Sequence, residues 1–269
     1  MIVCFSSCAI NDLGYKFGDF VLGIVLGPFL PREFVDENIS YTAASVDSTI
    51  AVTYVSDNGS DKVYIPDTAF GKQVNSLGNI AMFFGADDTH PGFSLSSAER
   101  VYLPWSIEKK CSPYLVSGPI DRTNELVFLW ASNSTSVATF DELHIGHPII
   151  YVVTSLGYEK IISEEWDVQN DYIEEKVNFV LPANIAYFFN YEENPNEGYF
   201  FVDLLEETGK LTPPPYNPHR EGYTFEGWYK DAECTEAWDF AKDEVKITFD
   251  EDGNRIYEEV KLYAKWRWK

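Results

Sequence analysis

The chain has 269 residues, enough for one large domain or two of ordinary size, each with a real hydrophobic core. Hydrophobic residues make up 45% and charged residues 23%, which excludes a chain that is disordered throughout. The aromatic content of 16% favours a β-rich fold, because aromatic side chains suit half-buried pleated surfaces. The net charge of −23 repels phosphate backbones and anionic lipid surfaces, so no nucleic-acid partner is expected.

The first residues are apolar but lack the basic segment and the length of a full signal peptide. Phe5-Ser-Ser-Cys8 resembles the end of a bacterial lipobox, where small residues precede a cysteine that becomes lipidated. Either the true start lies upstream and Cys8 is a lipid anchor, or this segment is a buried first strand. Residues 20–30 are apolar but include two glycines and a proline, and a membrane-spanning helix needs roughly 20 residues. Membrane contact is therefore expected only through a lipid anchor at Cys8.

Short apolar runs follow, each of the length of one strand. They occupy residues 50–55, 62–66, 99–104, 126–130 and 148–153. Proline closes the second and third runs, and it is expected to end each strand or to confine it to a sheet edge. The recurrence of the last four runs predicts a solenoid, in which each new strand adds to a parallel sheet.

Part of this region resembles the BspA-like leucine-rich repeats of bacterial surface antigens. The resemblance rests on Val63-Tyr-Ile-Pro66, Ala81-Met-Phe-Phe84, Leu95 and Val101-Tyr-Leu-Pro-Trp-Ser-Ile107. Tyr151-Val-Val153, Tyr158 and Trp166 resemble the strand and helical cap that close such arrays. One departure is Cys111-Ser-Pro113, which stands where a glycine and an Ala-Phe pair are expected. The resemblance implies a leucine-rich-repeat-like domain with a cap over residues 49–175. Residues 1–48 precede it as a leader-like start and first strand.

The last part of the chain, residues 176–269, is rich in strand and turn signals. Strand-like runs lie at residues 184–190 and 198–203, and the proline-rich residues 211–218 must be extended. A turn at residues 250–254 predicts a further hairpin.

Two runs in this part alternate in the way that strands do. In the first, Tyr223, Phe225 and Tyr229 are expected on one face and Trp228 on the other. In the final strand, three residues are expected to point inward, Leu262, Ala264 and Trp266.

Three motifs here resemble the Listeria–Bacteroides repeat, also called the internalin B-repeat type. They are Gly222-Tyr-Thr-Phe-Glu-Gly-Trp-Tyr229, Trp238-Asp-Phe240 and Leu262-Tyr-Ala-Lys-Trp266. The resemblance implies a compact β-grasp-like module at residues 176–269 and a bacterial surface or extracellular location. A charged hairpin insertion between Phe240 and Leu262 departs from the pattern. The expected fold class is mainly β (α+β), with a short solenoid sheet followed by this module.

No sequence motif for catalysis or cofactor binding stands out. The chain has no Gly-x-Ser-x-Gly elbow, phosphate-binding glycine loop or dinucleotide fingerprint. His144 and His147 have a spacing that suits a metal on a helix, but Gly146 and Pro148 favour a surface turn. The acidic surface is expected to maintain solubility, with weak divalent-cation binding as the alternative. No cofactor and no structural metal are therefore expected.

The aromatic residues of the last module are the remaining candidates for function. Trp228, Tyr229 and Trp268 are the predicted partner contacts, with burial in the core as the alternative, and Trp268 is the hardest to bury. We expect a monomeric binding, adhesion or display module without catalysis. Its partner would be a protein or glycan on a host or neighbouring cell. The alternative is a secreted hydrolase or sugar-active enzyme with its site in residues 50–175.

Overall fold

The structure is a computed structural model that describes the chain from residue 31 onward, with gaps. The described residues are 31–36, 39–44, 48–55, 61–77, 93–95, 99–107, 109–110, 115–117, 126–133, 149–163, 178–253, 255–256 and 259–269.

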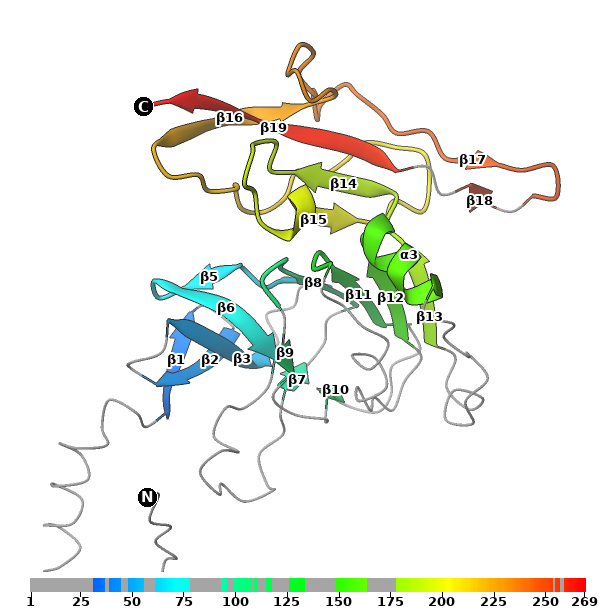
Figure 1. The fold of residues 1–269 in the computed structure, drawn as a ribbon. Coiled ribbons are helices and arrows are strands. Elements are labelled where there is room, and N and C mark those ends of the chain that lie inside the picture. The colour runs from blue at the N-terminus through cyan, green and yellow to red at the C-terminus, as the bar shows by residue number, and fades with distance from the viewer. Residues whose placement is uncertain are drawn as a thin grey trace, which may run out of the picture.

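Five parallel strands form a sheet at the centre of the molecule (Figure 1). In chain order and in spatial order they are β4 (Lys62–Tyr64), β8 (Arg100–Leu103), β11 (Leu126–Trp130), β12 (Ile149–Val153) and β13 (Asn178–Pro182). One row of side chains crosses the sheet through Val63, Val101, Phe128, Tyr151 and Val180. The predicted strands at residues 62–66, 99–104, 126–130 and 148–153 are confirmed. β13 lies beyond the predicted boundary at residue 176 and still pairs with β12.

An eight-stranded sheet packs on one side of the parallel sheet. Its strands are β1 (Pro31–Asp36), β2 (Ile39–Ala44), β3 (Thr49–Val55), β5 (Thr68–Ala69), β6 (Lys72–Leu77), β7 (Phe93–Leu95), β9 (Lys109–Lys110) and β10 (Leu115–Ser117). β1, β2 and β3 are antiparallel in succession, whereas β6 and β7 pair with β3 in parallel. Buried residues of both sheets, such as Ile50, Val74, Val101 and Trp130, form one hydrophobic core.

The C-terminal module is a four-stranded sheet. Across it lie β15 (Tyr199–Asp203), β14 (Ile185–Phe188), β19 (Val260–Trp268) and β16 (Tyr223–Tyr229), with only the β14–β19 pair parallel. A short 3-10 helix, η2 (Asn196–Gly198), precedes β15. The predicted hairpin is confirmed as β17 (Thr248–Phe249) and β18 (Arg255–Ile256), and Figure 1 shows it projecting at the end opposite to the C-terminus.

A β-bulge in β16 changes which of its side chains share a face. The register shifts between Phe225 and Gly227, so Glu226 is the extra residue opposite β19. After the bulge, Trp228 lies on the same face as Phe225, with ring centroids 5.1 Å apart. The predicted alternation in this run is therefore wrong beyond Phe225, and Tyr229 points to the opposite face. In β19 the prediction is confirmed, because Leu262 and Ala264 are buried and Trp266 packs against the same core.

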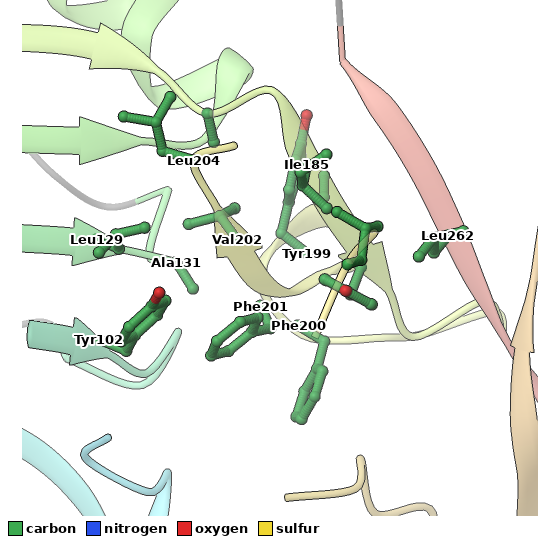
Figure 2. Close-up of a cluster of buried hydrophobic side chains, with 14 of the residues drawn as sticks. Tyr102, Leu129, Ala131, Ile185, Tyr199, Phe200, Phe201, Val202, Leu204 and Leu262 are labelled. Atoms are coloured by element: carbon green, nitrogen blue, oxygen red, sulfur yellow. The ribbon is translucent and has the colours of Figure 1, made fainter. Parts of the chain in front are cut away.

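The C-terminal module covers the second face of the parallel sheet. Figure 2 shows Tyr102 and Leu129 of the parallel sheet, and Ala131 just after β11, facing Phe201 and Val202 of β15. The rings of Tyr102 and Phe201 stack with centroids 5.3 Å apart and planes within 7°. Because both faces are covered, the strands of this sheet are apolar on both sides, as buried parallel strands usually are.

Polar contacts also cross between the two parts. Arg100 donates to the Leu204 carbonyl at 3.0 Å and to the Glu206 carboxylate at 2.6 Å. The Tyr102 hydroxyl donates to the Asp203 carboxylate at 3.0 Å. Burial raises the pKa of the Asp203 carboxyl, although the Tyr102 hydroxyl and the Arg100 guanidinium favour its charged form. These contacts fix the module on the sheet in one orientation.

One α-helix occurs in the described residues, α3 (Ser155–Ser163), directly after β12. It contains Tyr158, which the sequence places in a helical cap, whereas Trp166 lies outside the described residues. The mainly β fold is confirmed. The leucine-rich-repeat and β-grasp assignments stay predictions.

Candidate partner-binding surface

Trp228 is a core residue. Its side chain is 5% exposed, and its ring lies edge-on to Tyr187 and stacks on Phe200. A partner cannot reach this ring in the folded protein. The predicted contact role of Trp228 is therefore replaced by a role in the core, which the bulge in β16 explains.

Tyr229 lies half-buried on the outer face of the C-terminal sheet, the face that points away from the core residue Tyr187. The Lys265 ammonium lies 4.6 Å from the centre of the Tyr229 ring and donates to its hydroxyl at 3.3 Å. This residue is partly accessible, and its role in partner contact stays a prediction.

Trp268 is the most exposed large hydrophobic residue in the described part of the chain, at 70%. It is placed by the pairing of β19 with β16, which sets it opposite Tyr223 with the rings edge-to-face at 5.0 Å. The backbone of Lys269 donates to the Gly222 carbonyl at 3.1 Å and so fixes the end of the strand. Gly222 has φ +77°, a backbone conformation that glycine adopts without strain, and it forms the turn beneath the Trp268 ring.

Arg220 extends this surface beyond Tyr223. Its guanidinium lies 3.7 Å from the centre of the Tyr223 ring and 4.6 Å from that of Tyr191. Burial raises the pKa of Tyr191, and the nearby Arg220 guanidinium partly offsets this effect. Within the described part of the chain, no carboxylate forms an ion pair with Arg220. We call Tyr191, Arg220, Tyr223 and Trp268 the Trp268 patch.

The sequence interpretation missed Arg220 and Tyr191 as members of this surface. Tyr191 reaches it from a loop after β14, so only the tertiary fold brings it near Arg220 and Trp266. The signal for Arg220 was its position just before Gly222 and Tyr223, where a turn returns the chain to the strand that carries Tyr223.

Cys8, His144 and His147 lie outside the described residues. Cys234 is a half-buried free thiol, and burial raises its pKa. Among the residues with a described position, no group of three His, Cys, Asp or Glu side chains could hold a metal ion. None of the helices in those residues is long and apolar enough to cross a membrane.

Two proteins of Evansella cellulosilytica are similar to part of the chain. One, described as a membrane protein, is 31% identical over 109 residues, which are 40% of this chain and 14% of the relative. The other, described as a glycine-rich membrane protein, is 32% identical over 111 residues, which are 40% of this chain and 11% of the relative. The chain thus spans a small part of each relative's length. No solved structure matches the chain.

The family model of the Listeria–Bacteroides repeat domain matches residues 187–265. This range begins within β14 and ends within β19, so it covers most of the C-terminal sheet, and Trp268 lies just beyond it. The more specific internalin B-repeat assignment stays a prediction. The C-terminal repeat expected from the sequence is confirmed: residues 187–265 carry a Listeria–Bacteroides repeat domain.

Proposed function

We propose that the chain is a non-catalytic binding or display module of a bacterial cell-surface or secreted protein. The Listeria–Bacteroides repeat and the two relatives described as membrane proteins support a cell-envelope location. The partner is a protein or glycan on a host or neighbouring cell, and the chain acts as a monomer.

The observation that carries this proposal is the composition of the Trp268 patch. Tryptophan, tyrosine and arginine are the residues most enriched where interfaces gain their binding energy. The Tyr223 and Tyr191 rings hold the Arg220 guanidinium in place, so that little conformational entropy is lost when a partner binds. Trp268 offers a large apolar surface beside this cation.

The test compares binding of the full chain and two variants to a glycan array and to intact cells. Trp268→Ala removes the exposed ring of the patch. Phe249→Ala is the matched control, because Phe249 is 60% exposed and lies on the β17–β18 hairpin at the opposite end of the module. We expect Trp268→Ala to weaken binding at least about tenfold, as the loss of an interface residue worth about 1.4 kcal/mol does. Phe249→Ala should leave binding unchanged.

Equal binding by both variants would place the contact elsewhere and overturn the role of the patch. Binding to neither the array nor the cells would count against a binding module altogether. Turnover of an ester or polysaccharide substrate by the chain would favour the hydrolase alternative instead.

A further inference from the structure

A shallow hollow lies on the outer face of the C-terminal sheet, beside the loop of residues 190–198. Its volume is about 430 Å³. Phe188 of β14 and Tyr263 of β19 form its floor, and their rings stack with centroids 5.5 Å apart and planes within 23°. Asn190, Glu192 and Asn194 line its wall. We call it the 190–198 hollow.

The loop that forms the wall is held in an unusual backbone conformation. Four residues that are not glycine have left-handed φ angles between 53° and 56°: Asn190, Glu193, Asn196 and Glu197. Each such residue costs about 1–2 kcal/mol unless its side chain compensates, so the surrounding contacts must impose this shape. A loop shaped in this way before binding loses little entropy when a ligand arrives.

Side-chain anchors account for part of that shape. The Asn190 amide group donates to the Ala232 carbonyl at 2.9 Å and to the Ala264 carbonyl at 3.2 Å. The Asn194 amide group donates to the Tyr191 carbonyl. Gly198 lies so close to the floor that an added Cβ would be 3.2 Å from Phe188 Cδ1. The wall is therefore fixed against the aromatic floor.

These anchors leave the hollow rich in hydrogen-bond acceptors. The NH₂ groups of Asn190 and Asn194 are engaged within the protein, whereas their carbonyl oxygens and the Glu192 carboxylate accept no hydrogen bond within the described part of the chain. No lysine, arginine or histidine lines the hollow. A ligand must therefore bring its own donors.

A positively charged ligand would complement this lining of aromatic rings and hydrogen-bond acceptors. Aromatic ring faces attract ammonium groups within about 6 Å. The protein itself contains such a contact, since Lys261 Nζ lies 5.8 Å from the centre of the Phe188 ring. Lys160 Nζ lies 3.4 Å from the carboxylate of Glu197, a further lining residue. The net charge of −23 adds a long-range attraction for cations.

We propose that the 190–198 hollow binds a ligand with an alkylammonium group, held between the Glu192 carboxylate and the rings of Phe188 and Tyr263. This inference goes beyond the partner surface at Trp268 and does not depend on it. The ammonium group comes either from a lysine side chain of a partner protein or from a small amine such as choline.

The test titrates the full chain with N-acetyl-lysine amide and with choline, and follows the side-chain amide signals of Asn190 and Asn194 by NMR. The Nε-acetylated form of the lysine probe has the same shape without the charge and serves as the ligand control. We expect saturable shifts with a charged probe, a dissociation constant of about 1 mM, and no shifts with the acetylated form.

Two variants form the matched pair. Glu192→Gln removes the charge from the wall and should weaken binding at least about fivefold, whereas Glu193→Gln should not change it. Glu193 is the next residue, is equally exposed and does not line the hollow. Because both glutamates are exposed, neither substitution is expected to disturb the fold.

Saturation by choline alone supports a small quaternary amine, and saturation by the lysine probe supports a partner's lysine. Equal binding of the acetylated probe, unchanged affinity in Glu192→Gln, or no shift with either charged probe would each overturn the proposal. These readouts differ from the cell and glycan binding of Trp268→Ala, so the two proposals can fail separately.

Discussion

The side chain of Asn196 links the repeat to the segment that follows β11 of the parallel sheet. Its amide group donates to the Ala131 carbonyl at 2.6 Å and to the Tyr199 carbonyl at 2.9 Å. Its side-chain oxygen accepts from the backbone of Asn133 at 2.7 Å, and the Asn133 amide donates back to the Asn196 carbonyl at 2.7 Å. Asparagine also tolerates the left-handed φ of 53° that this position requires. Asn196 therefore stabilises both the loop conformation and the contact between the repeat and the parallel sheet.

Replacing this residue should destabilise the whole protein. We expect Asn196→Ala to lower the free energy of unfolding by about 2–3 kcal/mol, because it leaves polar backbone groups without partners. Urea denaturation followed by tryptophan fluorescence measures the change. Glu193→Ala is the control, since Glu193 has φ 56° in the same loop and an exposed side chain. If both variants lose the same stability, backbone strain and not the hydrogen bonds of Asn196 would be responsible.

For single residues, the sequence predicts burial or exposure where a simple pattern determines it. Strand alternation placed Leu262 and Ala264 inward, and proximity to the chain end made Trp268 the best candidate for an exposed ring. The pattern failed at Trp228, because one extra residue in the bulge reverses the faces of everything after it. Tyr191 could not be assigned because its cation–π contact with Arg220 is formed between segments far apart in the chain.

Helix α3 begins with a cap that constrains its first turn. The Thr154 hydroxyl oxygen accepts from the backbone of Gly157 at 2.9 Å, as an N-cap side chain does. The same hydroxyl donates to the Asn133 side-chain oxygen, so it cannot rotate away without loss of a buried hydrogen bond. A Cβ added at Gly157 would lie 2.9 Å from this oxygen.

This geometry reverses the usual effect of replacing a helical glycine. On helix propensity alone, Gly157→Ala would stabilise α3 by about 1 kcal/mol. We expect it to destabilise the protein by about 1–2 kcal/mol, because the new methyl group displaces the capping hydroxyl from both of its partners. Thermal unfolding shows whether Gly157→Ala lowers or raises the melting temperature. Glu159→Ala, at an exposed position of the same helix, is expected to be nearly neutral. A rise in melting temperature for Gly157→Ala would show that the cap adjusts freely.

Among the elements, strands with their own apolar pattern were predictable and strands defined by a neighbour were not. β11 and β12 are continuous apolar runs, β8 is apolar after Arg100, and each was expected from the sequence. β5 and β9 have two residues each and exist only because β6 offers backbone partners. Such short strands depend on the tertiary fold, so no local sequence pattern predicts them.

The parallel sheet and the C-terminal repeat share one buried hydrophobic cluster. Leu129 and Val152 of the parallel sheet belong to the same buried cluster as Ile185, Phe201 and Leu262 of the repeat. The sequence predicted a solenoid sheet followed by a separate module, and it gave no position for one relative to the other. The continuous apolar character of residues 126–130 was a signal that both faces of the sheet are covered. The covering element itself could be found only from the fold.

Because the core is shared, the chain should unfold as one cooperative unit. Leu129→Ala removes a side chain that is 1% exposed and should lower stability by about 2–5 kcal/mol. Hydrogen exchange should then report the same loss of protection in β12, on the parallel sheet, and in β19, which lies on the far side of β14 within the repeat.

Phe249→Ala is the control for this measurement, because Phe249 is exposed on the β17–β18 hairpin and should leave both strands unaffected. Loss of protection in β12 with β19 unchanged would show that the repeat unfolds independently of the sheet that it covers. Equal losses of protection in β12 and β19 would show that the parallel sheet and the repeat unfold together. A chain truncated before the repeat would then expose an apolar sheet face, so truncation could not separate the binding roles of the two parts. Point variants at Trp268 and Glu192 are then the way to assign them.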